Sequence, residues 1–419
     1  MQTHTLQTAI DAIKKKLTGK ALSYAEIFSI MDEIAKNRLG PVLTTYFAAA
    51  GFTEGFSDEE LYFLTKAMVE TGPVLHFHGT VADKHCVGGV AGTRTTMIVV
   101  PIIAAAGFQI PKTSSRAITS PAGTADTMEV LSPVTFVPRQ IERLVDKVGG
   151  CIVWGGHLGL APADDNIIQV EAPLAFESYD KIIVSIMAKK IASGATHLVL
   201  DIPVGKTMKI QHMKDAKLIR RKFSLLADRF GIKLHVDINE IHQNAGRGIG
   251  ALLEARDVMQ ILEQHKDRAL PLEEKAIRLA GELLDLCYYD SAKKSNKPGS
   301  LIAREMLTSG KAISKMREII HAQGGNSHIS SNSLHPSRHA FEVKAPRSGI
   351  VSKIDNQHIT VVCRVLGCPA DKRAGIYLNK KIGEKVDKND ILYTLYSSDE
   401  WKVSEAKDTL KNIVIYGIE

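Results

Sequence analysis

The stretch DKHCVGGVAGTRTTMIVVPIIAAAGFQIP, residues 83–111, contains the pattern that decides the fold class. A glycine-rich turn leads into an apolar helix predicted over 97–106, and a short strand is predicted over 108–111. The same alternation continues along the chain, with strands predicted over 151–154, 197–202 and 233–238 and helices over 125–131, 181–193, 215–230, 251–265, 271–288 and 301–323. Such alternation indicates an α/β fold whose mostly parallel sheet is covered by helices.

The segments on either side of this alternation have other patterns. Before it, apolar residues recur at helical spacing from Leu22 to Ala35, and Ser57 with Glu60 predicts a capping box at the start of a second helix. After it, a stretch over 324–336 that is rich in glycine, serine and asparagine predicts a boundary. Beyond this boundary, strands predicted over 340–343, 349–354, 360–365 and 391–396 indicate a small β-rich (α+β) module.

The composition is that of an ordinary globular protein, with 419 residues of which 44% are hydrophobic and 24% charged. These values exclude a disordered, collagen-like or disulfide-scaffold chain. The N-terminus has no uninterrupted apolar run, so we expect no signal peptide, and the longest apolar runs are too short to cross a bilayer. Five cysteines without a CxxC pair favour a reduced cytoplasm and argue against a zinc cluster, so we predict a cytoplasmic protein with no metal site and no membrane partner.

The formal net charge of the chain is +7. A basic balance fits nucleic acid, an anionic membrane, an anionic small substrate or simply a solvated surface. Only 6% of the residues are aromatic, which leaves few platforms on which RNA bases could stack. We therefore predict no nucleic-acid partner and ask where along the chain the cations lie.

The glycine-rich turn is the first candidate site. Lys84 precedes Gly88 and Gly89, and Thr95 follows them just before the predicted helix. Backbone N–H groups at such a turn can hold an anion together with the helix dipole, and Lys84 adds a full charge. The spacing matches neither a Walker A motif nor GxGxxG, so ATP and NAD are not the obvious ligands. Taken alone, the turn is either an anion cradle or a structural tight turn.

Two further segments carry polar groups at positions suited to a ligand. The loop KTSSRAITSPAGT, residues 112–124, follows a predicted strand, and its hydroxyls and arginine suit an oxyanion or a sugar phosphate. Farther along, Ser185 and Lys189 share one face of a predicted helix and can read the acceptors of a heterocyclic base. The alternative for both segments is a solvated surface. For 112–124, the glycine-rich turn and this loop flank one βα unit, which favours a site; for Ser185 and Lys189, taken alone, a solvated helix face is favoured.

Together these motifs resemble the thymidine phosphorylase family. The matching motifs are Lys-His-x-x-Gly-Gly-Val at 84–90, Ser-x-Arg at 114–116 with the downstream Gly-Thr, Ala-Pro-Ala-Asp at 161–164 and Ser-Ile-x-x-Lys-Lys at 185–190. The resemblance extends over nearly the whole chain and is closer to the AMP phosphorylase branch, as the segments 113–131, 151–165, 200–206 and 246–258 indicate. Archaeal members of that branch carry an extra N-terminal domain, which is not found in these 419 residues.

The resemblance implies a helical domain and a larger, mostly parallel α/β domain with the active cleft between them. We expect residues 1–75, joined by 160–193, to form the helical domain. Residues 76–159 and 194–328 would form the α/β phosphate-binding domain, and 336–419 the C-terminal α+β module. The implied assembly is a homodimer or a higher homo-oligomer. The implied reaction is phosphorolysis of a nucleoside or nucleotide, with inorganic phosphate as co-substrate and no cofactor.

The family's functional residues transfer by motif. Those implied to hold phosphate are Lys84, Gly88, Gly89, Thr95, Ser114 and Thr124. Those implied to bind the nucleotide are Gly89, Ser115, Arg116, Ala117, Ile118, Thr119, Ser120, Thr124, Ser185, Lys189 and Lys209. The implied catalytic residues are Glu177, which would protonate the leaving base, and His85, which would donate a hydrogen bond or carry a proton beside the sugar. His85 has the alternative role of fixing the loop.

Several positions depart from the family pattern. Pyrimidine-specific members have a base-contacting arginine at or beside Glu171, and a carboxylate there argues against ordinary thymidine binding. AMP-specific members share that glutamate but follow it with an arginine, where this chain has Ala172, and have an aspartate proton donor in place of Glu177. Cys86 replaces a phosphate-binding serine, which exchanges a strong hydrogen-bond donor for a weak one.

The leading hypothesis is a phosphorylase that converts AMP and phosphate into adenine and ribose 1,5-bisphosphate. The alternative is a thymidine or other pyrimidine nucleoside phosphorylase, which yields the free base and a (deoxy)ribose 1-phosphate. A related transferase, anthranilate phosphoribosyltransferase, also has a Gly-Gly turn but requires Mg²⁺, and Lys84-His85 before the glycines favours the phosphorylase. From another class, a noncatalytic nucleotide sensor is compatible with the departures at Cys86, Ala172 and Glu177.

Overall fold

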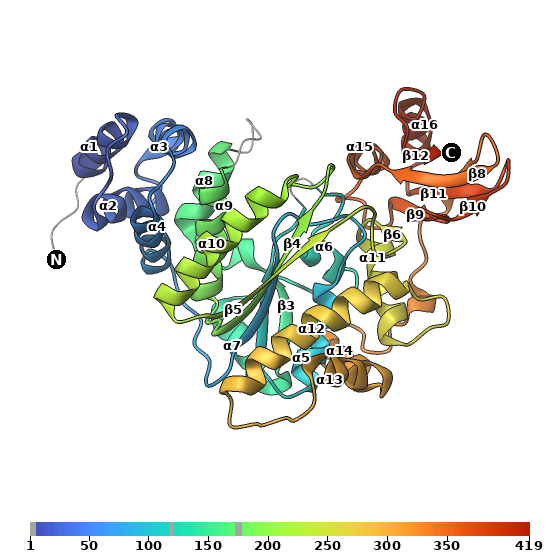
Figure 1. Cartoon of the computed structure of the whole chain (residues 1–419), viewed down its shortest axis with the longest axis horizontal. Helices are drawn as coiled ribbons and strands as arrows, with labels where there is room; N and C mark the ends of the chain where they lie inside the picture. The colour runs from blue at the N-terminus through green and yellow to red at the C-terminus, as the bar shows by residue number, and fades with distance from the viewer. Residues whose placement is uncertain (1–5, 118–119, 172–177) are drawn as a thin grey trace. The chain divides into compact units, whose positions relative to one another are not determined.

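The computed structural model describes residues 6–117, 120–171 and 178–419. By its internal contacts the chain divides into two compact units, whose elements are labelled in Figure 1. The first unit comprises Met1–Val81, Gly155–His197 and Lys217–Leu234, and the second comprises Ala82–Trp154, Leu198–Ala216 and His235–Glu419. The domain boundaries expected from the sequence remain predictions.

The first unit is built from helices: α1 (Leu6–Leu17), α2 (Tyr24–Ala35), α3 (Gly40–Glu54), α4 (Asp58–Glu70), α8 (Pro162–Glu171), α9 (Tyr179–Ala192) and most of α10 (Met213–Phe230). The predicted capping box is present at α4, where the Ser57 amide donates to Glu60 Oε2 at 2.9 Å and Ser57 Oγ accepts from the Glu60 amide at 3.2 Å. The same glutamate pairs with buried Lys16 at 2.9 Å, which ties α1 to α4. Helix α3 was not predicted from the sequence. It begins at Gly40-Pro41, where proline is well tolerated because the N–H groups of the first helical turn have no partner within the helix, so the N–H that proline lacks is not missed.

The second unit contains an α/β core. Its strands are β1 (Ala82–Cys86), β2 (Ile110–Ser114), β3 (Gly150–Trp154) and all but the first residues of β4 (His197–Val204) and β5 (Lys233–Glu240). The order β1-β4-β5 makes one sheet, and β2 pairs with β3 in parallel, Ser114 opposite Trp154. Parallel pairing brings the carboxyl ends of both strands to one edge, where the loops that follow them meet.

Helices pack around these strands, as Figure 1 shows. They are α5 (Thr96–Ala105), α6 (Thr124–Met128), α7 (Pro138–Val148), α11 (Ala251–Leu262), α12 (Leu270–Asp290), α13 (Gly299–Thr308) and α14 (Lys311–Ala322). Helix α5 is apolar on all sides, and its buried residues join those of α11 to α14 in one core. The region predicted to be helical over 301–323 forms two helices, because Gly310 takes a left-handed φ of +79° and separates α13 from α14.

The C-terminal module contains β7 (His339–Lys344), β8 (Gly349–Ile354), α15 (Asn356–Leu366), β9 (Gly375–Leu378), β10 (Lys385–Val386), β11 (Ile391–Ser397), α16 (Glu400–Thr409) and β12 (Tyr416–Ile418). The short strand β6 (Gly248–Ile249), which precedes α11, pairs antiparallel with β9, and this pair extends the sheet in the order β6-β9-β11-β7. The module is thus joined to the α/β core by backbone hydrogen bonds (Figure 1).

One strand of the module was wrongly predicted. Residues 360–365 lie within helix α15, although threonine and valine favour strands. The helix forms because Asp355 caps its first turn by accepting from the amides of Gln357 and His358, and Gly367 ends it in a left-handed conformation. Its buried residues recur at helical spacing: Ile359, Val362, Cys363 and Leu366.

The predicted fold class is confirmed in its three parts: a helical domain, a larger α/β domain with parallel strand pairing, and a small β-containing C-terminal module. The active cleft expected between the first two remains a prediction. Among the described residues, no helix is both long enough and apolar enough to cross a membrane.

Candidate active site

Strand β1 and the turn after it place Lys84 in the interior of the second unit. The Lys84 side chain is 1% exposed, and its Nζ donates to Thr95 Oγ1 at 3.0 Å. The turn between them is possible because Gly88 and Gly92 adopt φ values of +82° and +65°, which favour glycine. The fold therefore brings two predicted phosphate ligands, eleven positions apart in sequence, into direct contact.

Asp201, on β4, forms ion pairs with both Lys84 and Lys275. Its Oδ2 lies 3.4 Å from Lys84 Nζ, and its Oδ1 lies 3.0 Å from Lys275 Nζ and accepts from Asn239 at 2.9 Å. Burial by itself would raise the pKa of Asp201, but Lys84 and Lys275 outweigh it and lower that pKa to about 2. Asp201 is thus a permanent anion between two ammonium groups.

Two further predicted site residues, Lys209 and His85, lie next to the glycine turn. A Cβ atom on Gly88 would stand 2.7 Å from Lys209 Cβ, so the turn and the exposed Lys209 pack directly against each other. Gly89 is exposed next to them, and half-buried His85 follows Lys84 on β1. Residues separated by more than a hundred positions thus gather at one place.

Cys86 ends β1 at the same site. Burial, and next the charge of Asp201, raise the pKa of its thiol to about 12, so the sulfur is a neutral thiol at pH 7. A thiol is only a weak hydrogen-bond donor. The departure from serine at Cys86 therefore removes donor strength without adding a nucleophile.

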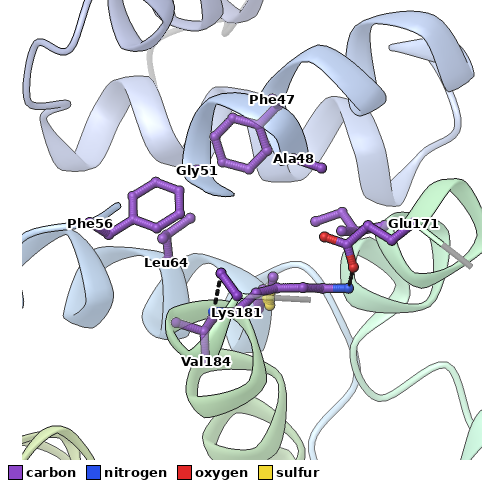
Figure 2. A pocket seen from close by; sticks show the side chains of 11 residues that line it. Phe47, Ala48, Gly51, Phe56, Leu64, Glu171, Lys181 and Val184 are labelled. Atoms are coloured by element: carbon purple, nitrogen blue, oxygen red, sulfur yellow. Dashed lines mark hydrogen bonds and ion pairs between the residues drawn. The ribbon is translucent and has the colours of Figure 1, made fainter. Parts of the chain in front are cut away.

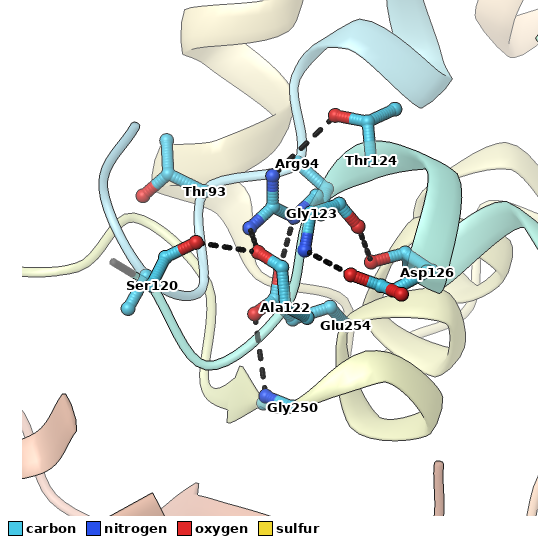
Figure 3. Close-up of polar contacts among 12 residues, drawn as sticks. Thr93, Arg94, Ser120, Ala122, Gly123, Thr124, Asp126, Gly250 and Glu254 are labelled. Carbon is cyan, nitrogen blue, oxygen red and sulfur yellow. Dashed lines mark hydrogen bonds and ion pairs between the residues drawn. The ribbon is translucent and has the colours of Figure 1, made fainter. Parts of the chain in front are cut away.

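The second loop begins at the carboxyl end of β2. Ser114 Oγ is buried and has no hydrogen-bond partner among the described residues. Buried hydroxyls normally have a partner, so this atom is suited to receive a ligand oxygen. Thr124, at the start of α6, accepts from Arg94 Nη1 at 3.4 Å (Figure 3).

Arg94 connects this loop to α11. Its guanidinium donates to the Ala122 carbonyl at 2.5 Å and pairs with the buried carboxylate of Glu254. Figure 3 shows the Arg94 guanidinium with Thr124 above it and the Ala122 carbonyl and Glu254 carboxylate below it. Because its donors face the protein, Arg94 fixes the position of Thr124 rather than offering a free charge.

Arg116 is also satisfied within the protein. It donates to both oxygens of Glu129 at 2.6 Å, lies 3.2 Å from Asp126 Oδ1, and stacks 4.7 Å from the centre of the Trp154 ring. The hydrogen bonds from Arg116 to Glu129 raise the pKa of Arg116 further. Ser115 is exposed, Ser120 Oγ donates to Ala122 O at 2.8 Å, and the predicted ligands Ile118 and Thr119 lie outside the described residues.

In the first unit, the two predicted base-facing residues meet at one carboxylate. Ser185 Oγ donates to Asp164 Oδ2 at 2.6 Å, and Lys189 Nζ lies 2.7 Å from the same oxygen. Asp164 is completely buried; burial would raise its pKa, but Lys189 and then Lys181 lower it below its usual value. In Lys189, burial is outweighed by Asp164 and Asp165, which raise its pKa, so both partners are charged.

The first unit also has a pocket at Glu171, whose carboxylate forms an ion pair with Lys181 (Figure 2). The remaining lining is mostly apolar, from Phe47, Phe56, Leu64 and Val184. Its free volume of about 30 Å³ has room for one or two waters. The predicted proton donor Glu177 lies outside the described residues.

Known proteins resemble this chain over most of its length. Family models match at 10–72 (glycosyl transferase family, helical bundle domain), 78–313 (glycosyl transferase family, a/b domain) and 350–417 (pyrimidine nucleoside phosphorylase C-terminal domain). A putative thymidine phosphorylase of Methylococcus capsulatus is 44% identical over 93% of this chain and 74% of its own. An AMP phosphorylase of Methanocaldococcus jannaschii is 41% identical over 94% of this chain and 77% of its own. The chain belongs to the thymidine and AMP phosphorylase family.

This phosphorylase is a pentosyltransferase of the nucleoside phosphorylase type. Its substrates are accordingly a small nucleoside or nucleotide and phosphate. Among solved structures, anthranilate phosphoribosyltransferase from Thermus thermophilus matches with a TM-score of 0.61 at 19% identity, over 75% of this chain and 99% of its own. That likeness concerns the fold alone.

The balance of positive and negative charge differs between the glycine turn and the hydroxyl-rich loop of the phosphorylase. At the turn, Lys84 and Lys275 share the single carboxylate of Asp201, so one positive charge remains for an anion. By contrast, Arg94 is matched by Glu254, and Lys112, 3.1 Å from Asp83, is matched as well. The surplus is therefore located where a phosphate dianion would be attracted.

Sequence reasoning missed the carboxylates that organise these sites. Asp164 and Asp201 were part of the motifs that carried the resemblance, but nothing in their spacing assigned them partners. For Lys275, in the second turn of α12, nothing in the sequence indicated a place in the site. A buried strand that contains one acidic residue, as β4 does in LVLDIPV, is the signal that could have identified Asp201, since buried charges need partners.

Proposed function

We propose that this phosphorylase acts on a nucleoside 5′-monophosphate and converts AMP and inorganic phosphate into adenine and ribose 1,5-bisphosphate. Phosphate is the co-substrate, and no cofactor or metal ion takes part. Lys84, the Gly88-Gly89 turn, Thr95, Ser114 and Thr124 hold the attacking phosphate. The excess charge at Lys84 and the partnerless hydroxyl of Ser114 among the described residues support this assignment.

The reaction requires a nucleophile and a protonated leaving group. As the glycosidic bond breaks, the sugar becomes electron-poor at C1′, and a phosphate held close to it lowers the barrier. Ser185 and Lys189 face the base, and both are held by Asp164, which restricts their positions. Glu177 supplies the proton to the departing base, and His85 donates a hydrogen bond near the sugar and phosphate.

The observation that carries the choice of AMP is the carboxylate at Glu171. Pyrimidine-specific members of the family have a base-contacting arginine at or beside this position. Here the side chain is buried and ion-paired with Lys181, so no guanidinium is present at Glu171 to contact a pyrimidine carbonyl.

Thymidine phosphorolysis is the second candidate. The observation in its favour is the name of several relatives at 41–45% identity, putative thymidine phosphorylases from Methylococcus, Legionella and Rhodopseudomonas. In that reaction the products would be thymine and deoxyribose 1-phosphate.

A substrate panel decides between the two. Purified protein is incubated with phosphate and AMP, GMP, CMP, UMP, adenosine, uridine or thymidine, and the released base is measured by chromatography. We expect AMP to give the highest kcat/KM, release of adenine to depend on phosphate, and EDTA to have no effect. Equal or faster turnover of thymidine would refute the AMP assignment. Activity that needs Mg²⁺ and no phosphate would refute phosphorolysis, and tight nucleotide binding without turnover would indicate a sensor.

We also propose a homodimer in the cytoplasm. Helix α3 exposes Val42, Tyr46 and Phe52, which gives the helical unit an apolar surface that a second copy can cover. All five cysteines are free thiols, as in a reducing compartment. Light scattering coupled to gel filtration tests the assembly, and a monomer at micromolar concentration would refute it.

A further inference from the structure

One lysine of the C-terminal module reaches the predicted nucleotide loop. Lys372 lies in the turn between α15 and β9, and its Nζ is 2.8 Å from Asp126 Oδ1 and 3.0 Å from Glu129 Oε2. Its backbone carbonyl accepts from the amide of Leu252 at 3.0 Å, which holds the turn against α11. The lysine is therefore fixed at both ends, and its side chain is 31% exposed.

The two carboxylates that Lys372 contacts are the ones that shape the loop. Asp126 accepts from the amide of Ala117 at 2.7 Å and from that of Gly123 at 2.9 Å, on either side of the hydroxyl-rich segment. Glu129 accepts hydrogen bonds from Nη1 and Nη2 of Arg116, which stacks on Trp154. Burial would raise the pKa of Asp126, but hydrogen bonding to Lys372 is the largest of the effects that lower it.

The charges in this group balance only when Lys372 is present. Two cations, Arg116 and Lys372, face two carboxylates, of which Asp126 is nearly fully buried. Without Lys372 a net negative charge would remain directly under the loop. Such a charge repels a phosphoester and also weakens the hold of Asp126 on the loop, because a buried carboxylate that loses its partner is poorly stabilised.

We propose that Lys372 is a positioning residue for the nucleotide: through Asp126 and Glu129 it fixes Arg116, Ala117 and Gly123 of the nucleotide loop, so the C-terminal module determines affinity for the 5′-monophosphate. This inference rests on the proposed function, in which that loop binds the nucleotide. Of the ligands proposed for the attacking phosphate, Lys84 and Thr95 contact none of these residues. Ser114 and Thr124 flank the loop, but Thr124 accepts from Arg94 and the Ser114 hydroxyl has no partner among the described residues, so neither depends directly on Asp126 or Glu129. The two substrates should therefore respond differently to a change at Lys372.

The test is Lys372→Met in the full chain, with AMP and phosphate varied independently. We expect KM for AMP to rise about tenfold, which is less than the loss on truncating a directly contacting partner of a buried charge pair, because Lys372 acts on the nucleotide only through the loop. KM for phosphate and kcat should change less than twofold. Lys372→Arg should restore most of the affinity. The matched control is Lys380→Met, since Lys380 in the same module is 26% exposed and pairs with Asp390 at 3.0 Å, away from the loop.

A second variant separates charge balance from loss of folding. Glu129→Gln combined with Lys372→Met leaves Arg116 facing Asp126 alone, which restores neutrality, so its KM for AMP should lie below that of Lys372→Met. An unchanged KM for AMP in Lys372→Met would overturn the proposal. Equal losses for both substrates together with a lower Tm would also overturn it, because they indicate a merely structural role.

A spectroscopic readout keeps the test independent of the substrate. The chain has two tryptophans, and in a Trp401→Phe background the emission reports on Trp154 beneath Arg116. Lys372→Met should change that emission, and Lys380→Met should not. If the wild type fails to cleave AMP, the proposed function is refuted on its own, and the Trp154 signal still decides the role of Lys372: an unchanged emission overturns it.

Discussion

Lys275 offers a sharp test of how the site holds phosphate, because it touches no predicted substrate ligand except through Asp201. In the wild type, Asp201 lies between Lys275 at 3.0 Å and Lys84 at 3.4 Å, and one positive charge is left over. Lys275→Met leaves Lys84 and Asp201 as a neutral pair. The lysine at the predicted phosphate position is then intact, but the site has lost its excess charge.

The expected effect follows from Coulomb's law. The carboxylate separates the two ammonium groups, which puts Lys275 on the order of 9 Å from a phosphate at Lys84; at an effective dielectric constant of about 40, a dianion there gains roughly 2 kcal/mol from the Lys275 charge. A loss of about 2 kcal/mol corresponds to an increase on the order of 20- to 30-fold in KM for phosphate. KM for the nucleotide should change much less.

Steady-state kinetics with both substrates varied measure the effect. Lys275→Arg preserves the charge and serves as the control, whereas Lys84→Met removes the contacting lysine and should nearly abolish phosphorolysis. The Lys84 variant should still fold, because Asp201 keeps Lys275 as its partner. A KM for phosphate in Lys275→Met within twofold of the wild type would show that the excess charge does not bind phosphate.

Three further changes test the remaining parts of the site and the α/β core. Asp164→Asn should raise KM for the nucleotide and lower the free energy of unfolding by about 1–2 kcal/mol, measured by denaturant titration, because Lys189, which is 32% exposed, loses its nearest partner and keeps only Asp165 at 3.6 Å; unchanged values for both would remove Asp164 from the base site. Glu177→Gln should reduce kcat more than it raises KM if this residue protonates the leaving base, and an unaltered kcat would exclude it. Burial, and next the charge of Asp237, raise the pKa of Glu282 to about 7. Between about pH 4.5 and 7 the folded state therefore keeps a proton on Glu282 that the unfolded state has lost. The free energy of unfolding falls as pH rises through that window. Glu282→Gln should therefore be more stable than the wild type at pH 8, by about 1–2 kcal/mol after allowance for its partial exposure, and equal to it near pH 4; the same difference at both pH values would contradict this.

Local patterns in the chain predicted much of the fold. The capping box at Ser57, the apolar run that became α5 and the strands near Cys151 and His197 all follow from neighbours within a few residues. The same reasoning failed at 360–365, where β-branched residues favoured a strand. There the caps at Asp355 and Gly367, together with packing of one helical face, outweighed a weak intrinsic preference.

For the site, the sequence by itself determined the ligand-bearing segments: the glycine turn after Lys84, the hydroxyl-rich loop after Lys112, and the spacing of Ser185 and Lys189. It also indicated that a modest surplus of cations serves an anionic substrate. Only the tertiary structure decided which of these cations are free to attract it. The charge of Arg116 is neutralised by Glu129 and Asp126. Lys84 and Lys275 share the carboxylate of Asp201, so one of their two positive charges is left to attract an anion. The reason is that the attraction of a charged side chain for a ligand depends on the opposite charges that lie next to it, and in a folded chain these come from segments that are distant in sequence.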